Sequence, residues 1–416
     1  MEVRPGYKQT EVGVIPEEWK VMSLGELGQF KNGINKGKED FGHGFPFVNL
    51  MDVFGIPKVS ADTTDFGLVN STPAERKLYE LQRGDVLFVR SSVKPDGVGL
   101  TTLIPESLPD TVFSGFLIRF RDNGQLAHGF KEHCFWHEGF RNRLISNSTV
   151  SANTNINQEA LKRLQIGFPS SLPEQTYIAA ALSDADRLLR ALDQIIAKKR
   201  DLKQAAMQQL LTGQTRLPGF HGEWEVMRLG DLTEIISGGT PKTTEPSYWN
   251  GGVKWCTPTD ITGCQSKYLV ETERTISRLG LNSSGAQLLS AGALLLCSRA
   301  TIGEIRIAGC EVCTNQGFKS LVCRPGVSNE YIFYKLLTMK QQMVERAFGS
   351  TFLEISKANV AALELSMPTL PEQIAIADVL ADMDAELTEL EQRRDKTRDL
   401  KQGMMQELLT GRTRLV

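Results

Sequence analysis

The residues in this sequence that are best suited to chemistry are four cysteines. Cys310 and Cys313 have the C-x-x-C spacing of a zinc knuckle, and Cys297 and Cys323 could supply two further thiolates. The surroundings of the pair are apolar and strand-like, and no second paired cysteine or histidine motif follows. The total of seven cysteines is odd. We therefore expect reduced thiols packed in strands, and no metal site.

A second metal-like spacing is formed by His133 and His137, which stand at i and i+4. A zinc protease motif also needs a glutamate between the two histidines, and none is present. The apolar residues between them favour a packed helix instead. Gly97 and Gly99 lack the rest of a dinucleotide-binding fingerprint, and no phosphate-binding P-loop occurs. We expect no nucleotide site in this chain.

The composition is that of a soluble globular chain, long enough for two or three domains. Of the 416 residues, 41% are hydrophobic and 23% are charged, and the net charge is −2. No run of about eighteen apolar residues is available to span a membrane, and the N-terminus lacks a secretory signal. We expect a cytoplasmic protein with no membrane partner. The net charge neither indicates nor excludes a nucleic-acid partner, because acids elsewhere can offset a basic face.

The strongest pattern in the sequence is a tandem duplication. Segment 172–217 aligns without a gap to segment 370–415, with about 27 of 46 positions identical. Both copies begin with Leu-Pro-Glu-Gln and contain Leu-Leu-Thr-Gly near their ends. The sequence between the copies hardly matches. One part of the architecture is therefore constant, while another part differs between the two halves.

Each copy of the repeat predicts one long helix of about 38 residues and about 57 Å. Pro173 and Pro371 suit the first turn, and Gly213 and Gly411 suit the ends. Apolar residues at heptad spacing predict that the helices pair as a coiled coil. We favour an antiparallel pair, which places the two intervening domains at opposite ends; the alternative is that each helix packs on its own globular domain. The predicted pairing residues are Ile178, Leu182, Leu189, Leu192, Ile196, Ile376, Leu380, Met383, Leu387 and Leu390.

The parts outside the repeat are predicted to be two mixed α/β domains with many short strands. A weak repeat remains there, since the segment Gly84 to Arg90 recurs as Gly292 to Arg299. Segment 4–7 also resembles segment 216–220, as though the chain were cut from a circle. The predicted α+β architecture has a first domain at 1–171, a first helix at 172–213, a second domain at 214–369 and a second helix at 370–416.

Several motifs resemble the specificity subunits of type I restriction-modification systems, over essentially the whole chain. They are segment 7–16 before Trp19, Asn155-Ile156-Asn157-Gln158 before Phe168-Pro169, the two Leu-Pro-Glu-Gln helix starts, segment 298–303 and segment 314–318. The resemblance implies two target-recognition domains, each reading one half of a bipartite double-stranded DNA target. It also implies an antiparallel helix pair that spaces the domains and docks two methyltransferase subunits. Segment 90–95 departs from the pattern of segment 299–303, so the first reading loop is expected to be built differently.

The resemblance and the two-fold repeat together predict the form of the target. Half-sites about one helical turn apart, about 34 to 36 Å, predict an unread gap of about 5 to 8 base pairs. The half-sites should be unlike, because the two domains differ. S-adenosylmethionine is expected on the partner methyltransferase, since this chain has no Asn-Pro-Pro-Tyr or Asp-Pro-Pro-Tyr tetrapeptide. The sequence leaves open whether restriction subunits join as well.

Polar loops at matching places in the two halves are the candidate DNA-binding segments. The strongest candidate is Arg299, because an arginine that leaves an apolar strand into a Thr and Gly turn is well placed for a bidentate contact to guanine. For any one residue the alternative is a solvated loop or a turn, above all for Gly238 and Gly239. The first-half candidates are Lys31, Asn32, Asn35, Lys36, Arg90, Ser91, Ser92, Lys94, Asn153, Thr154, Asn155 and Asn157. The second-half candidates are Ser237, Gly238, Gly239, Thr240, Lys242, Ser298, Arg299, Thr301, Asn315, Gln316, Ser350 and Thr351.

Two other functions stand beside DNA recognition. An enzyme is disfavoured because no catalytic motif is found. An assembly scaffold whose variable domains bind protein is disfavoured by the constant helices and divergent domains, and favoured by the absence of a basic excess. If DNA is the ligand, the isolated chain should bind it weakly and the assembled complex more strongly, with a dependence on salt.

Overall fold

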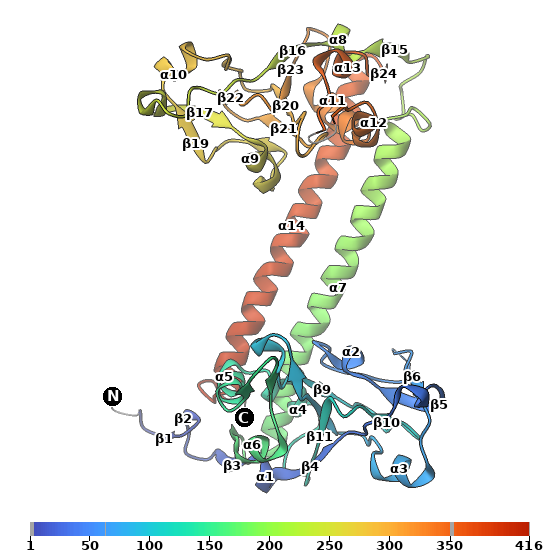
Figure 1. The fold of residues 1–416 in the computed structure, drawn as a ribbon, viewed down its shortest axis with the longest axis vertical. Coiled ribbons are helices and arrows are strands. Elements are labelled where there is room, and N and C mark those ends of the chain that lie inside the picture. The colour runs from blue at the N-terminus through green and yellow to red at the C-terminus, as the bar shows by residue number, and fades with distance from the viewer. Residues whose placement is uncertain (1–3, 63, 350–352, 416) are drawn as a thin grey trace. The chain divides into compact units, whose positions relative to one another are not determined.

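The computed structural model describes residues 4–62, 64–349 and 353–415, which form two compact units (Figure 1). The first unit contains Met1–Asp193 and Gln392–Val416, and the second contains Gln194–Glu391. Each unit therefore combines one variable region with part of both long helices. Both units mix helices and strands, as the sequence predicted.

A four-stranded antiparallel sheet of order β4-β11-β7-β9 forms the centre of the first unit. A three-stranded sheet, β10-β5-β6, and the pair β14-β3 lie beside it. The strands are β1 Tyr7–Thr10, β2 Gly13–Pro16, β3 Lys20–Ser23, β4 Gly28–Asn32, β5 Phe41–Val48, β6 Gly67–Val69, β7 Val86–Val89, β8 Ser91–Ser92, β9 Thr101–Leu103, β10 Val112–Phe113, β11 Leu117–Asp122, β12 Thr149–Val150, β13 Thr154–Asn155 and β14 Gln165–Phe168. The helices are α1 Leu24–Leu27, η1 Lys38–Asp40, α2 Leu50–Val53, α3 Pro73–Leu78, η2 Pro95–Gly97, α4 Phe130–Cys134, α5 Glu138–Ser146, α6 Gln158–Arg163 and the start of α7 Leu172–Leu210.

The central sheet of the first unit is covered on both faces at β7, which explains why this strand is apolar at every position. Val86 and Phe88 of β7 pack in one core cluster, with helices α4 and α5, whereas Leu87 and Val89 pack in another. Successive side chains of a strand point to opposite faces, so two clusters are the expected result.

The second unit repeats this plan around a five-stranded sheet of order β16-β23-β20-β21-β18. Leu294 and Leu296 of β20 face one core cluster and Leu295 faces another. Its strands are β15 Glu225–Arg228, β16 Thr233–Ser237, β17 Trp249–Cys256, β18 Tyr268–Leu269, β19 Arg274–Ile276, β20 Leu294–Leu296, β21 Ile305–Ala308, β22 Cys313–Thr314, β23 Lys319–Cys323 and β24 Glu364–Met367. Its helices are α8 Leu229–Leu232, η3 Pro246–Tyr248, α9 Pro258–Gly263, α10 Arg278–Asn282, α11 Asn329–Leu337, α12 Lys340–Glu345, α13 Lys357–Ala361 and the start of α14 Leu370–Leu408.

The two long helices, α7 and α14, have 39 residues each, close to the predicted length. In the first unit Asp186 of α7 pairs with Lys401 of α14, and Asp193 pairs with Arg394, so the two segments run in opposite directions. In the second unit Lys199 pairs with Glu386 at 2.6 Å. All ten predicted pairing residues are buried or half-buried.

The ends of the long helices also enter the cores of the globular parts. Ile178 and Leu182 of α7 share a cluster with Phe130 of α4 and with Leu408 at the end of α14. In the second unit the matching cluster contains Ile376 of α14 together with residues from the end of α7. Within each unit, therefore, the helices contact both each other and the globular part. Among the described residues no helix is long and apolar enough to cross a membrane.

The suggestion of a circular arrangement has a structural counterpart at the chain termini. Tyr7 donates a hydrogen bond from its hydroxyl to Gly411 O at 2.9 Å, which ties the N-terminal strand to the end of the second repeat. Arg414 of the same tail pairs with the buried Glu174. In the second unit, Arg216 and Glu372 occupy the same repeat positions and form the equivalent ion pair. Each globular part is thus closed by the tail of the helix that began in the other half of the sequence.

Candidate nucleic-acid interface

The two central sheets place equivalent loops after strands β7 and β20. The matched backbone hydrogen bonds are Arg90 N to Phe116 O and Ile156 N to Arg90 O in the first unit, and Ser298 N to Gly317 O and Ile355 N to Ser298 O in the second. Arg90 therefore occupies the position of Ser298. The match of Arg90 to Arg299 that the sequence suggested is wrong by one residue, because similar residue types were aligned rather than backbone partners.

The true equivalent of Arg299 is Ser91. Ser91 of β8 pairs with Asn155 of β13, and an isolated antiparallel bridge pairs Arg299 with Glu354 in the same way. The same place in the fold thus holds a neutral Ser and Asn pair in the first unit. In the second unit it holds an Arg and Glu pair.

Arg299 lies at the surface, in a tight turn. Its Nη2 is 2.7 Å from Oε2 of Glu354, and Oε1 of Glu354 is 3.3 Å from Nζ of Lys319. Burial acts to raise the pKa of Glu354, but hydrogen bonds from Arg299 and Lys319 outweigh it and lower this pKa. The carboxylate is therefore charged and fixes one side of the guanidinium, while 45% of the Arg299 side chain remains exposed. This arrangement leaves the remaining guanidinium donors available for a base edge.

The first unit brings four of its predicted residues together around a hollow. Ser91, Ser92, Lys94 and Asn153 all line it. The other lining residues are mainly apolar, and the sequence interpretation missed their role. The sequence did indicate an apolar contribution in segment 91–95, where one valine stands among polar residues and a proline.

The predicted segment after β4 is held by contacts within the first unit. Lys36 pairs with Glu75 at 2.9 Å, and Lys31 Nζ lies 5.4 Å from the centre of the Tyr79 ring. Asn35 packs so closely on Gly115 that a Cβ there would come within 1.9 Å of its Oδ1. Asn32 ends β4.

Several predicted residues have their side chains committed to local structure. Asn157 caps helix α6, accepting a hydrogen bond from Ala160 N at 2.9 Å. Thr154 and Ser298 are buried. Asn155 donates from Nδ2 to Asn153 O at 2.9 Å. Thr301 lies in the turn that Arg299 begins, donating its backbone N–H to Arg299 O at 2.6 Å, and Arg90 donates from Nη1 to Gly115 O.

In the second unit the loops after β16 and β22 lie together. Thr240 donates its hydroxyl hydrogen to Oε1 of Gln316, which joins the two predicted segments. A Cβ on Gly238 would lie 2.0 Å from Asn315 O, so the absence of a side chain permits this close approach. Lys242 accepts from Trp249 Nε1 through its backbone carbonyl, Gly239 accepts from Trp255, Ser237 ends β16, and Asn315 accepts from Gly317 N. Ser350 and Thr351 lie outside the described residues.

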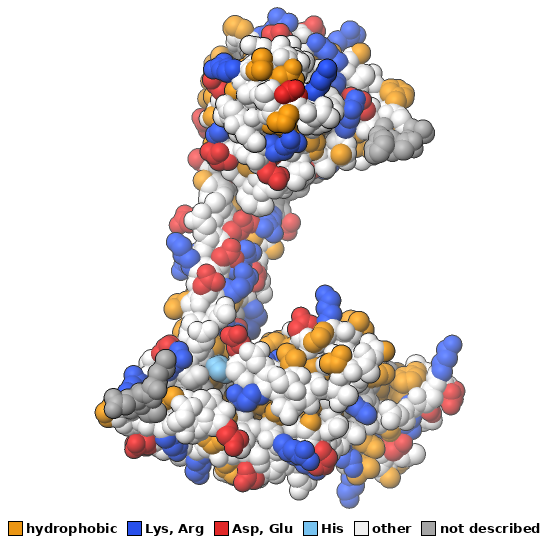
Figure 2. Space-filling model, turned by 60° about the vertical axis from the view of Figure 1, so that its left-hand side comes forward, with side chains coloured by type: hydrophobic (Ala, Val, Ile, Leu, Met, Phe, Trp, Pro, Cys, Tyr) orange, Lys and Arg blue, Asp and Glu red, His pale blue; other side chains and the backbone are white. Residues whose placement is uncertain are grey.

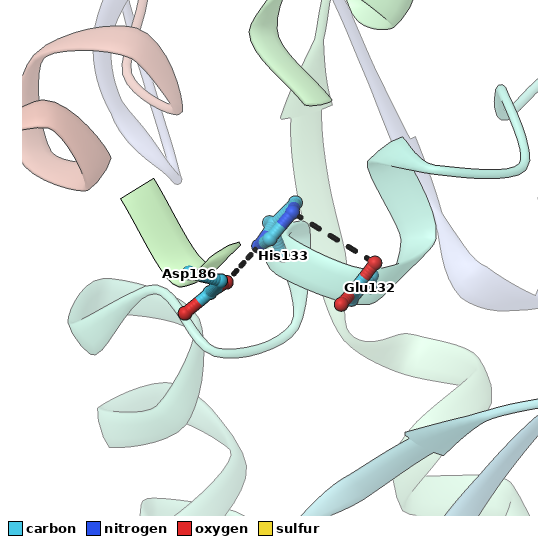
Figure 3. Close-up of side chains that lie close together, drawn as sticks. All are labelled: Glu132, His133 and Asp186. Atoms are coloured by element: carbon cyan, nitrogen blue, oxygen red, sulfur yellow. Dashed lines mark ion pairs between the residues drawn. The ribbon is translucent and has the colours of Figure 1, made fainter. Parts of the chain in front are cut away.

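A cluster of titratable residues, Glu132, His133 and Asp186, joins α4 to α7 in the first unit (Figure 3). His133 Nε2 is 3.9 Å from Glu132 Oε2, and His133 Nδ1 is 4.0 Å from Asp186 Oδ2. Among the described residues this is the one group with metal-ligand spacing. Its two carboxylates are already paired with Lys58 and Lys401, so their charge is balanced without an ion. Burial lowers the pKa of His133 to about 4, which keeps the ring neutral at pH 7.

The spacings that suggested metal sites are separated in the structure. Helix α4 ends at Cys134, and His137 is the N-cap of α5, so the expected single helix through both histidines is wrong. Cys310 Sγ lies 3.4 Å from Val270 O, and Cys313 Sγ lies 3.1 Å from Lys254 O. All seven cysteines are free thiols.

A family model for the type I restriction modification DNA specificity domain matches residues 16–199 and 221–397 of the chain. The type I restriction enzyme MjaIX specificity subunit of Methanocaldococcus jannaschii is 34% identical over 164 residues, which are 39% of this chain and 38% of that relative. A second relative from this organism, provisionally named type I restriction enzyme MjaX specificity subunit, is 25% identical over 98% of this chain and 97% of its own length.

Solved structures share the fold. A chain from a structure of type I R-M system assembly and conformational transition has a TM-score of 0.61 at 17% identity, covering 95% of this chain and 99% of that one. The type I restriction-modification S subunit from M. genitalium has a TM-score of 0.59 at 13% identity and covers 98% of each chain. At these identities the likeness concerns the fold alone.

Proposed function

The chain belongs to the type I restriction-modification DNA specificity family, and we propose that it is the non-catalytic subunit that reads a bipartite, asymmetric DNA target. Each unit would recognise one half-site. The observation that carries this proposal is the contrast at one position of a shared fold, Ser91 with Asn155 against Arg299 with Glu354. Because the side chains at equivalent positions differ, the two units should recognise different bases. The target should therefore be asymmetric.

We further propose that α7 and α14 pair along their length as an antiparallel coiled coil that sets the unread gap. Each helix is about 58 Å long at 1.5 Å per residue, enough to bridge half-sites about 34 to 36 Å apart. Opposite helix directions are supported by two ion pairs in each unit. These are Asp186 to Lys401 with Asp193 to Arg394 in the first, and Arg200 to Glu391 with Lys203 to Asp384 in the second. Two methyltransferase subunits would dock on these helices and bind S-adenosylmethionine. The complex would act in the cytoplasm.

Methylome sequencing tests the proposed function. A host would express the methyltransferase subunit with this chain and without it. We expect a gapped, two-part adenine motif only with the full chain. No chain-dependent motif, with the methyltransferase expressed and soluble, would contradict the proposal and favour a protein-binding scaffold.

Salt dependence provides a second test, on the assembled complex. Contacts to phosphates release counterions, so the logarithm of the affinity should fall linearly as the logarithm of the salt concentration rises. The isolated chain, with its net charge of −2, should bind the same duplex more weakly than the complex. An affinity that does not change with salt concentration would contradict contacts between the complex and the DNA phosphates.

A further inference from the structure

The first unit exposes apolar side chains beside its candidate DNA-binding loop. The exposed fractions are 76% for Met51, 40% for Phe54, 81% for Val93 and 57% for Phe116. All four line one hollow of about 670 Å³, and Figure 2 shows hydrophobic side chains gathered on the surface of this unit. We call these four residues the apolar surface. Large apolar side chains gather in this way mainly where a surface binds a partner.

The fold holds the apolar surface in place through local structure. Asn49 caps α2 in a capping box with Asp52, which fixes Met51 on the helix and Phe54 at its end. Gly97 lies so close to Phe54 that a Cβ would come within 2.8 Å of the ring. The loop after β8 therefore packs directly on the ring.

The second unit shows that the fold does not require this apolar character. Helix α9 has the capping box of Thr257 and Asp260, at the positions of Asn49 and Asp52. Counting along the two helices from these caps places Thr259 where Met51 stands and Thr262 where Phe54 stands. The matched backbone bonds place Gly317 where Phe116 stands. Three apolar residues of the first unit are thus replaced by small or polar ones.

The rim of the hollow has the residue types that bind the polar parts of DNA. Ser91 and Asn153 offer a hydroxyl and an amide, and Lys94 offers a cation for a phosphate. The rim also contains one acid, Asp96, whose backbone carbonyl accepts a hydrogen bond from Arg141 at 2.7 Å. The surface therefore combines an apolar floor with a polar rim that suits a nucleic acid.

We propose that the apolar surface receives the 5-methyl group of a thymine in the major groove of the half-site read by the first unit. The thymine methyl is the apolar group that base pairs present in the major groove, which makes it the natural occupant of such a floor. This inference rests on the proposed function and deepens it. The first unit discriminates by apolar contact to T·A pairs, whereas the second discriminates by charge.

Deoxyuridine, which is thymine without its methyl group, gives a direct test. Duplexes carrying the mapped target would have each thymidine of both half-sites replaced singly by deoxyuridine, and initial methylation rates would be measured with the complete complex at subsaturating DNA. Burial of one methyl group corresponds to about a fourfold change in affinity. We expect about a fourfold loss at one or more thymidines of one half-site, and at none of the other.

The variant Val93→Thr tests whether the apolar surface causes this loss of methylation rate. It replaces one methyl group with a hydroxyl at a position that is 81% exposed and therefore tolerant of change. In this variant the deoxyuridine loss should shrink to less than about twofold. Val226→Thr makes the same change at an exposed valine of β15 and should keep the full loss. Phe116→Gly introduces the glycine that the second unit has at this position. It should also reduce the effect of deoxyuridine on the methylation rate.

The outcomes separate this inference from the proposed function. A two-part target with no deoxyuridine loss, or a loss that Val93→Thr leaves unchanged, overturns the thymine contact and keeps DNA recognition. Impaired assembly of Val93→Thr with the methyltransferase, with deoxyuridine losses unchanged, identifies a protein-docking surface and also overturns it. Absence of any two-part target overturns both.

Discussion

The two units attach to their long helices through matching contacts. Gln175 of α7 accepts a hydrogen bond from Ala127 N at 2.7 Å, and Gln373 of α14 accepts one from Ser328 N at 2.9 Å. Both glutamines also donate to the carbonyl of a proline just before the helix, at 2.9 Å in each unit. The glutamines are buried, so each needs these partners. The junction between globular part and helix is therefore the same structure built twice.

The outer loops differ at equivalent positions. The second unit places the ion pair of Arg299 and Glu354 where the first places Ser91 and Asn155, and the first unit adds an apolar floor beside them. The sheet and the junction therefore support a loop surface without determining its chemistry. A change at the junctions should thus have equal effects in both units, whereas a change in the loops should affect one half-site.

The largest expected effect is on stability, from the ion pairs at the junctions. Glu174 and Glu372 have side chains that are 3% and 1% exposed, so removal of Arg414 or Arg216 leaves a buried carboxylate unpaired. Arg414→Ala and Arg216→Ala should each lower the free energy of unfolding, by similar amounts and by more than a substitution at the surface. Chemical denaturation measures this, with Arg412→Ala as the exposed control. Losses no larger than that of Arg412→Ala, or very different losses in the two variants, would contradict equivalent junctions.

Arg299→Ala should relax sequence preference at one half-site only. Loss of a bidentate contact to guanine costs about 1 to 3 kcal/mol of discrimination against the wrong base. Binding-site selection with the assembled complex would show one degenerate half-site beside an unchanged one. Arg278→Ala changes an exposed arginine of α10 and should leave both half-sites intact. Unchanged specificity in Arg299→Ala would remove this residue from the interface.

The residue that contacts the aspartate of the long helix is a histidine in the first unit and a tyrosine in the second. This difference predicts a pH effect on stability that is confined to the first unit. His133 contacts Asp186, whereas Tyr334 donates to Asp384 at 2.7 Å at the matching repeat position. Burial lowers the pKa of His133 from 6.5 to about 4, with Lys401 and Lys58 acting in the same direction and Asp186 opposing them. The unfolded chain therefore binds a proton between these pH values and the folded chain does not, so stability falls as the pH is lowered through this window.

The expected loss from His133 is about 2 kcal/mol between pH 7 and pH 5. Urea denaturation at both pH values would compare the chain with His133→Gln, which cannot titrate. The variant should lose about 2 kcal/mol less than the parent chain over this interval. An equal pH dependence in the two proteins would mean that the unfolded and folded states bind the proton equally.

The smallest expected effect comes from Glu354→Gln. The pair of Glu354 and Arg299 is partly exposed, so its charge contributes at most about 1 kcal/mol. The variant keeps an acceptor for Arg299 and should weaken preference at that half-site by less than about fivefold. Glu271→Gln removes the charge of another exposed pair and serves as the control. An effect as large as that of Arg299→Ala would indicate that Glu354 itself contacts a base.

The helices and central strands could be predicted because their signals are local. Heptad spacing identified Ile178 and Leu380, and apolar runs identified β7 and β20. The equivalence of Arg299 with Ser91 was available by counting seven residues from Gly84 and from Gly292, but the match of residue types, arginine to arginine, concealed it. The bridge from Arg299 to Glu354 identifies the correct match. The exposure of Phe116 could not be predicted, because it follows from packing around it.

Methylome sequencing of one host with either Arg299→Ala or Phe116→Gly in this chain tests directly whether each unit reads one half-site. Both variants would be expressed with the same methyltransferase subunit and compared with the parent chain. We expect each variant to degrade one half of the motif, with a different half affected by each variant and the gap unchanged. Degradation of the same half by both variants, or of both halves by either one, would contradict it.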